Sequence, residues 1–200
     1  EYLASPESHA TPVNRAEITA QLAEVELRRG NAGEARKLLD QAQAYWNQDR
    51  GQHRVALTTS RQLQAQIERE ESGLPTSIRT LQAALREHDA YFGRQHLTTA
   101  SLLNSLGIAY QSNNDTDLAD AAFRDAWAVY TALGQENSAG ALLTLGNWAT
   151  VAFRKNDLAS AEDRLRKAGA LRRELYGPSA ALAAMQANLG KVVLRARRAD

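Results

Sequence analysis

The chain has 200 residues, 44% of them hydrophobic, a composition typical of a folded protein that excludes wholesale disorder. Its 24 Lys and Arg residues nearly balance 23 Asp and Glu residues, and a net charge of +1 argues against a dedicated nucleic-acid binder. The absence of cysteine excludes disulfides and thiolate zinc sites, and no apolar run reaches the roughly 18 residues of a membrane span.

The charges are unevenly distributed along the chain. Residues 151–200 contain 11 Lys and Arg against 5 Asp and Glu, a local charge of +6. This end either orients a partner or is simply solvated. The chain begins at Glu1, with neither Met nor an apolar leader, so we expect a segment of a longer protein. We expect the segment to be soluble, and cytoplasmic and periplasmic locations both stay open.

Residues 1–12, which include Pro6 and His9, have the composition of a linker or of the end of a preceding unit. After them, the sequence predicts pairs of helices, most clearly in residues 101–127. There Leu106, Gly107 and Tyr110 continue a stripe that follows one helix face. The polar run 113–117 then supplies turn and N-cap chemistry.

The next predicted helix carries small residues opposite a mid-helix glycine. Ala119, Phe123 and Ala126 form its stripe, at the spacing i, i+4 and i+7. Gly107 costs about 1 kcal/mol relative to alanine in a helix interior. We therefore expect its missing side chain to allow close approach of Ala119, with Leu103 and Phe123 filling the space around them. Two such helices joined by a short turn form an antiparallel hairpin.

The same pattern recurs along the chain with a period of 42 residues. The first small residue of the second stripe recurs at Ala35, Ser77, Ala119 and Ala161. The central pair of the first helices recurs at Leu22-Ala23, Gln64-Ala65, Leu106-Gly107, Trp148-Ala149 and Leu189-Gly190, with 41 residues in the last step. We interpret Trp46, Trp127 and Trp148 as interior packing.

The pattern Leu-Gly-x-x-Tyr of residues 106–110, with Ala119, Phe123 and Ala126, resembles the tetratricopeptide repeat (TPR). The period of 42 resembles the longer kinesin-light-chain type of that family, and the resemblance covers residues 13–198. It implies an all-α fold, an α-solenoid of antiparallel helix hairpins in a right-handed superhelix, with about four hairpins plus a C-terminal helix. The second repeat departs most from the family pattern, since Gln64 and Ser77 replace the usual Leu and Ala.

We expect a repeat domain over residues 13–200. Its units are predicted at about 16–57, 58–99, 100–141 and 142–182, followed by a terminal helix over 183–198. That helix either caps the apolar face of the last hairpin or belongs to a longer array. In the first case Val192, Val193 and Leu194 are expected to pack inward.

The sequence indicates no enzyme, no cofactor and no metal site. It lacks a phosphate-binding loop, a G-x-S-x-G elbow and an H-E-x-x-H motif. Its histidines, His9, His53, His88 and His96, never stand four residues apart on one predicted helix. For His96, in a loop between repeats, we expect a local packing role.

A partner is expected on the concave surface, which the first helices of such a stack line. The residues off the packing stripe that the repeat period places there are Gln62, Gln66, Arg69, Asn104, Gln111, Asn147, Arg154, Lys191 and Arg195. Amides can bond the backbone of an extended peptide, and cations can hold a carboxylate. Some TPR domains hold a C-terminal carboxylate in a Lys/Asn/Arg clamp, and Asn147, Lys191 and Arg195 resemble parts of it. A solvated face is the alternative at each position.

The leading hypothesis is a protein-interaction scaffold that binds a peptide or protein segment, acidic or with a free C-terminal carboxylate. The alternative is a sensory or regulatory domain of a larger bacterial signalling protein, such as a Ser/Thr kinase or a transcription regulator. Nucleic-acid binding through the basic C-terminal part is the least favoured hypothesis. Self-association through an uncapped end also stays open.

Overall fold

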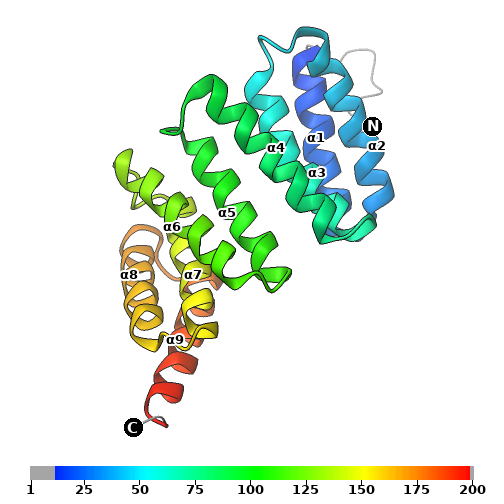
Figure 1. Ribbon diagram of the computed structural model, residues 1–200. Coiled ribbons are helices and arrows are strands. Elements are labelled where there is room, and N and C mark those ends of the chain that lie inside the picture. Colours follow the sequence, from blue (N-terminus) through cyan, green and yellow to red (C-terminus); the bar gives the residue numbers. More distant parts are fainter. Residues whose placement is uncertain (1–11, 199–200) are drawn as a thin grey trace. The chain divides into compact units, whose positions relative to one another are not determined.

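The computed structural model describes residues 12–198, and every long regular element within that range is an α-helix (Figure 1). In chain order these are α1 (Pro12–Arg28), α2 (Ala32–Trp46), the short 3-10 helix η1 (Asn47–Asp49), α3 (Arg54–Glu71), α4 (Leu74–Phe92), α5 (Leu97–Ser112), α6 (Thr116–Ala132), α7 (Ala139–Arg154), α8 (Leu158–Tyr176) and α9 (Ala180–Ala196). The predicted all-α helical-repeat fold class is confirmed. The linker predicted over residues 1–12 lies outside the described residues, except for Pro12, where α1 begins.

The helices follow the predicted period. The second helices of the hairpins begin at Ala32, Leu74, Thr116 and Leu158, at intervals of 42 residues. The first helices begin three or four residues before the predicted unit starts, because capping residues lie upstream of the packing stripe. Ser138 accepts a hydrogen bond from the Ala141 N–H before α7, and Ser179 accepts one from the Leu182 N–H before α9.

The chain divides into two compact units, residues 1–87 and 88–200. In the first unit α1 and α2 form a hairpin, and α3 packs against both of them. Trp46 is 4% exposed and packs with Ala16 and Ala42, as expected of an interior tryptophan. The other core cluster of this unit consists of Ala23, Leu27, Ala35, Leu39 and Ile67.

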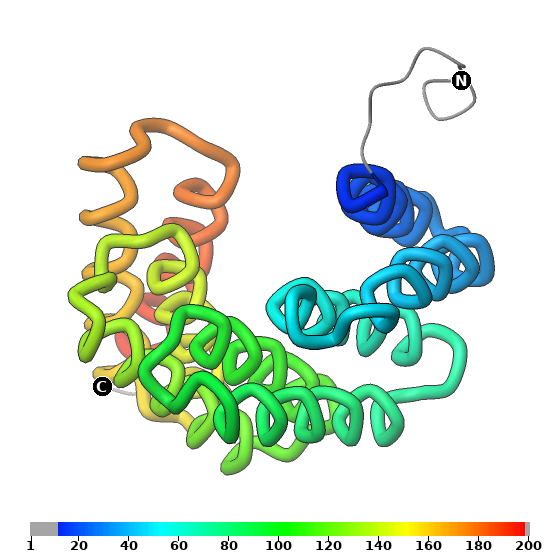
Figure 2. The backbone as a smooth tube through the Cα atoms, turned by 90° about the horizontal axis from the view of Figure 1, so that it is seen from above, coloured from blue at the N-terminus to red at the C-terminus, as the bar shows by residue number. Residues whose placement is uncertain are grey.

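In the second unit α5 pairs with α6 and α7 pairs with α8, while α9 packs on α8 and α7 (Figure 2). Met185 and Val192 of α9 join the core cluster of Leu142 and Leu165. The inward packing predicted for Leu194 is wrong, because its side chain is 60% exposed. Consecutive residues point about 100° apart around a helix, so Val192 faces inward and a residue two positions later turns away.

The second repeat contains a polar network centred on Gln64 and Glu68. Gln64 Oε1 accepts from Gln43 Nε2 at 3.4 Å, and Gln64 Nε2 donates to Glu68 Oε1 at 2.8 Å. Thr80 Oγ1 donates to Glu68 Oε2 at 2.6 Å, and Arg36 Nη1 lies 4.0 Å from Glu68 Oε1. Glu68 is only 7% exposed, so these partners compensate a carboxylate that is largely removed from water.

Candidate functional site

The first helices of the second unit lie side by side, because α7 contacts both α5 and α9. We call their exposed faces the first-helix surface of the second unit. The predicted partner-binding residues on these helices are Asn104 and Gln111 of α5, Asn147 and Arg154 of α7, and Lys191 and Arg195 of α9.

Asn104 and Asn147, in equivalent turns of consecutive repeats, are hydrogen-bonded to each other. Asn147 Nδ2 donates to Asn104 Oδ1 at 3.2 Å, and Thr144 Oγ1 donates to the same oxygen at 3.2 Å. Both asparagines remain half-buried, so part of each amide is accessible. Within residues 12–198, neither Asn104 Nδ2 nor Asn147 Oδ1 has a partner. The pair therefore presents one donor group and one acceptor, which are complementary to a peptide backbone.

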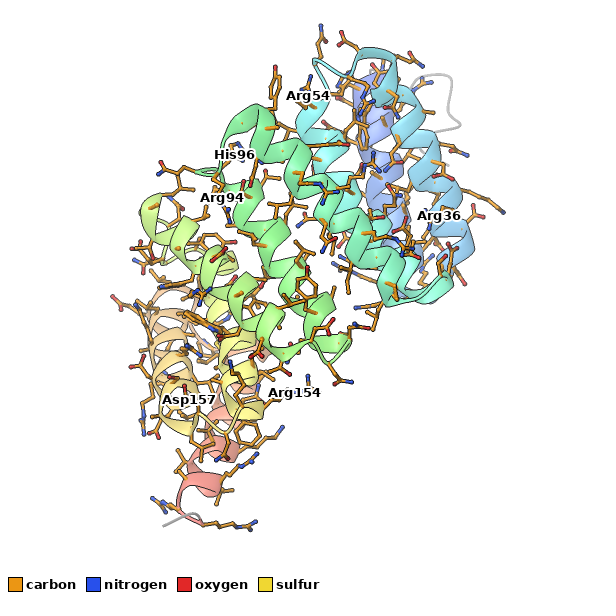
Figure 3. The ribbon with its side chains drawn as sticks, viewed as in Figure 1. Arg36, Arg54, Arg94, His96, Arg154 and Asp157 are labelled. Atoms are coloured by element: carbon orange, nitrogen blue, oxygen red, sulfur yellow. The ribbon has the colours of Figure 1, made fainter. Side chains whose placement is uncertain are left out.

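Arg154, labelled in Figure 3 near the end of α7, forms hydrogen bonds to the preceding repeat. Its Nη1 donates to the backbone oxygen of Gln111 at 2.8 Å, and its Nη2 donates to Asn114 Oδ1 at 3.3 Å. The guanidinium thereby satisfies a carbonyl at the C-terminal end of α5, where cations are favoured. Arg154 thus contacts the backbone of Gln111, and part of its bonding capacity is used internally.

A cavity of about 180 Å³ lies between α7 and α9. Its lining residues are Ala149, Thr150, Phe153, Leu165, Asn188, Lys191 and Val192. The Arg195 guanidinium carbon lies 4.9 Å from the centre of the Phe153 ring, a cation–π distance. Lys191 Nζ lies 3.5 Å from Asn188 Oδ1. The repeat period also places Thr150, Phe153 and Asn188 along this groove, since Thr150 and Phe153 are in register with Ile108 and Gln111.

The charge of this surface has one sign. The sequences of α5, α7 and α9 contain no Asp or Glu. Their only Lys and Arg residues are Arg154, Lys191 and Arg195, which lie toward the ends of α7 and α9. A surface with cations and no carboxylate attracts anionic segments of a partner and disfavours cationic ones.

The other predicted site residues, Gln62, Gln66 and Arg69, lie on α3 in the first unit. Gln66 and Arg69 are exposed, and Gln62 is half-buried. A wide cavity of about 740 Å³ lies between α1 and α3, and these three residues do not line it. Its charged lining residues are the acids Glu17 and Glu24, so its charge is opposite to that of the first-helix surface of the second unit.

Two further classes of site were searched within residues 12–198. No three His, Asp or Glu side chains there lie close enough together to hold a metal ion. No helix in the same range combines the length and the apolar character needed to cross a bilayer.

A family model described as tetratricopeptide repeat matches residues 99–133, the segment of α5 and α6. The match covers the third hairpin, and the neighbouring hairpins repeat its helix pattern at the same period. No curated protein sequence matches it. TPR folds generally serve as scaffolds for protein–protein interaction and are generally non-catalytic.

Solved TPR structures of the kinesin-light-chain type share the fold. The BtubC (BKLC) structure from P. vanneervenii superposes with a TM-score of 0.80 at 20% identity, covering 92% of this chain and 75% of that one. A Podosopora anserina protein described as a kinesin light chain with nearly identical TPR-like repeats gives 0.73 at 16% identity, covering 93% and 89%. The TPR sensor protein of the STAND ATPase class from Pyrococcus horikoshii gives 0.65 at 14% identity, covering 83% and 25%.

Proposed function

We propose that the chain is a protein-interaction scaffold whose first-helix surface in the second unit binds an extended, acidic segment of a partner protein. The observation that carries this proposal is the absence of Asp and Glu from α5, α7 and α9, combined with the cations Lys191 and Arg195 beside an apolar cavity. Cations on α7 and α9, with no carboxylate on any of the three helices, favour an anionic ligand over a cationic one.

The contacts proposed for this ligand follow from the groups that the surface offers. The backbone of the segment bonds to the free donor of Asn104 and the free acceptor of Asn147. A carboxylate, from a side chain or from a C-terminus, pairs with Lys191 and Arg195. One aliphatic side chain enters the cavity of about 180 Å³ beside Phe153.

The test uses a fluorescently labelled decapeptide of Glu, Asp and Leu with a free C-terminus. Its C-terminal amide and a Lys-for-Glu/Asp analogue serve as matched probes, and polarisation is measured at two salt concentrations. We expect the acidic peptide to bind, with affinity falling as salt rises, and the basic analogue not to bind. If the C-terminal amide binds more weakly than the acidic peptide with a free C-terminus, the carboxylate that the surface holds is that of a chain terminus.

Single substitutions test whether the peptide binds to the first-helix surface of the second unit. Asn147→Ala and Lys191→Gln are each expected to weaken binding by about fivefold or more. Lys167→Gln is the control, because Lys167 is an exposed cation on α8 whose Nζ lies 4.8 Å from the centre of the Trp127 ring. Equal binding of the acidic and basic peptides, or unchanged affinity of Lys191→Gln, would contradict the proposal. Preferential binding of an RNA oligonucleotide would point to the nucleic-acid hypothesis instead.

A regulatory role within a larger protein is the second candidate. It is favoured by the structural likeness to an ATPase whose repeats are described as a sensor, of which this chain covers 25%. The full open reading frame tests it directly. An adjoining ATPase, kinase or DNA-binding domain would support this role, and the absence of any such domain would count against it.

A further inference from the structure

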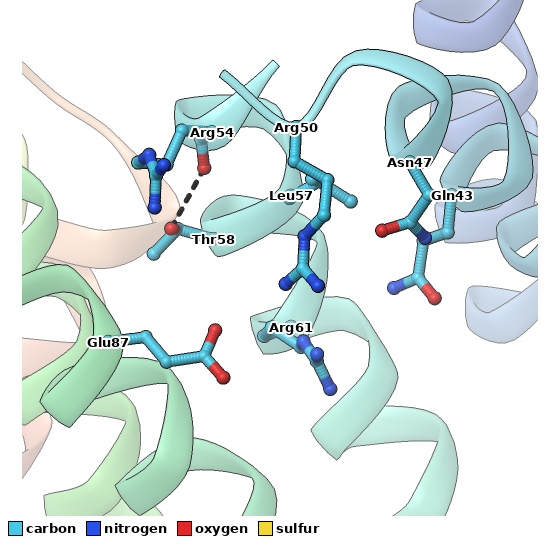
Figure 4. A pocket seen from close by; sticks show the side chains of 8 residues that line it. All are labelled: Gln43, Asn47, Arg50, Arg54, Leu57, Thr58, Arg61 and Glu87. Atoms are coloured by element: carbon cyan, nitrogen blue, oxygen red, sulfur yellow. Dashed lines mark hydrogen bonds between the residues drawn. The ribbon is translucent and has the colours of Figure 1, made fainter. Parts of the chain in front are cut away.

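A small polar pocket lies in the first unit, where the chain passes from α2 through η1 into α3 (Figure 4). Its volume is about 50 Å³. Its lining residues are Gln43, Asn47, Arg50, Arg54, Leu57, Thr58, Arg61 and Glu87. Arg50, Arg54 and Arg61 are three arginines that line this small space, and the proposed peptide surface of the second unit uses none of these residues.

Arg50 is the most available of the three arginines. Within residues 12–198 its guanidinium has neither a hydrogen bond nor an ion pair. Among the described residues no ion pair joins Arg50 to the neighbouring Asp49, whose Oδ1 accepts a hydrogen bond from the Gln52 N–H at 3.1 Å. In Figure 4 the Arg50 guanidinium lies between the Glu87 carboxylate and the amides of Gln43 and Asn47.

The remaining groups leave the pocket with an excess of positive charge. Arg61 is half-buried and makes one long hydrogen bond, 3.5 Å from Nη1 to Gln64 Oε1. Arg54, also half-buried, is the first residue of α3, so the positive end of that helix dipole adds to the field. Glu87 is the only acid among the lining residues, and no ion pair joins it to Arg50 or Arg61 within residues 12–198.

We propose that this pocket binds a dianionic phosphoryl group. Three guanidinium groups and one carboxylate sum to two positive charges, and a phosphate monoester carries about −1.5 to −2 at neutral pH. A planar guanidinium group donates hydrogen bonds to phosphate oxygens in pairs. A single carboxylate would use fewer of these donors. The volume exceeds the roughly 10–15 Å³ that one water needs and is far below that of a drug-sized ligand site.

The phosphoryl group has two possible sources, a phosphorylated Ser or Thr of a protein segment or free phosphate. The experiment measures binding to the intact chain by isothermal titration calorimetry at about 0.15 M salt. The probes are inorganic phosphate, the peptide Ala-Ala-phosphoserine-Ala-Ala and its unphosphorylated form. Tighter binding of the phosphopeptide identifies a protein-borne group, and binding of inorganic phosphate alone identifies the free anion; both support the proposal.

Two substitutions with opposite expected effects on binding affinity make the test specific to the pocket. Arg50→Gln is expected to weaken phosphate or phosphopeptide binding by about tenfold or more. Glu87→Gln is expected to tighten it several-fold, because it removes the competing carboxylate. Arg79→Gln is the charge-matched control, since Arg79 bonds Thr76 on α4 and does not line the pocket. The affinity of this variant for phosphate or phosphopeptide should not change.

The proposal is overturned if neither inorganic phosphate nor the phosphopeptide binds, or if the two peptides bind equally while inorganic phosphate does not bind. It is also overturned if Glu87→Gln fails to tighten binding or if folded Arg50→Gln binds like the unsubstituted chain. Circular dichroism verifies folding of each variant, and Glu87→Gln decides the outcome should Arg50→Gln not fold. A failure of peptide binding on the second unit would leave this result unaffected, because the two sites share no residue.

Discussion

The Phe123 ring occupies the space that a side chain at Gly107 would need. A Cβ atom built on Gly107 would lie 2.6 Å from Cε1 of Phe123, a distance that real Cβ contacts essentially never show. Phe123 is fully buried and packs with Ala119 and Val151. This contact explains why a residue that disfavours helices stands in the middle of α5.

Gly107→Ala is expected to destabilise the protein, although alanine is the better helix former by about 1 kcal/mol. Overpacking against Phe123 costs about 1–3 kcal/mol, which outweighs that gain. The free energy of unfolding in urea measures the difference. Gly190→Ala is the matched control, because nothing lies within 4 Å of its added Cβ on α9, and it should be neutral or stabilising. Stabilisation by Gly107→Ala would contradict the packing account.

The stability of the second unit is expected to fall as the pH drops through the range in which histidine titrates, about pH 6.5. Burial lowers the pKa of His88, the charge of nearby His96 lowers it further, and Asp89 opposes both effects. Below the ordinary histidine pKa the unfolded chain therefore binds a proton that folded His88 does not, so the unfolding free energy decreases with falling pH. Urea midpoints at several pH values measure this slope.

His88→Gln should flatten that slope, because position 88 then no longer titrates. The centre of the His96 ring lies 4.7 Å from that of the tilted His88 ring, and His96 Nδ1 accepts from the Thr98 N–H at 3.1 Å, which matches the local packing role expected for it. His53→Gln, in the first unit, serves as the control and should leave the slope of the second unit unchanged. An identical slope in His88→Gln would refute the assignment.

Asp120→Ala is expected to cost about 1.5–3 kcal/mol of stability, the range for hydrogen bonds to charged groups. Trp148 Nε1 donates to Asp120 Oδ1 at 2.6 Å, and Lys155 Nζ lies 3.7 Å from Asp120 Oδ2. Tryptophan fluorescence during unfolding reports the change. Asp125→Ala removes a more exposed partner, that of Arg94, and should cost about 1 kcal/mol or less. Equal losses in the two variants would argue against the Trp148 bond.

Gln64→Leu restores the usual TPR residue, yet it is expected to destabilise the first unit by about 1–3 kcal/mol. Gln64 Nε2 donates to buried Glu68, and leucine would leave that carboxylate with fewer donors. Adding Glu68→Leu should recover part of the loss, since replacing both partners with apolar groups is often tolerated. Chemical unfolding of the single and double variants provides the measurement, and a more stable single variant would refute the role of the network.

The hairpins could be predicted because each repeat places its packing residues at the same positions. The details of the turns could not, since a short polar side chain has several competing partners. N-cap chemistry was predicted for residues 113–117, but Asp115 makes no side-chain cap bond and accepts instead from Asn113 Nδ2 at 2.6 Å. Asp117 pairs with Lys155 of the next repeat, at 3.0 Å from Nζ to Oδ1.

The repeat period could predict one of the two candidate sites and not the other. The period places Asn104 in register with Gly146, next to Asn147, and the structure joins the two asparagines by a hydrogen bond. The arginine pocket was missed because Arg50 precedes α3, outside any packing stripe. Arg54 and Arg61, seven residues apart on one helix face, were a signal that could have drawn attention to it.

The bond between Asn104 and Asn147 also has a consequence for how specificity can change. The two amides belong to successive copies of the repeated unit, so on the proposed peptide surface a bound backbone would contact both of them together. A single substitution in one copy disturbs the readout of the other, whereas coordinated exchange at both positions can rewrite it. New specificities in such an array therefore require correlated changes 43 positions apart in the gene product.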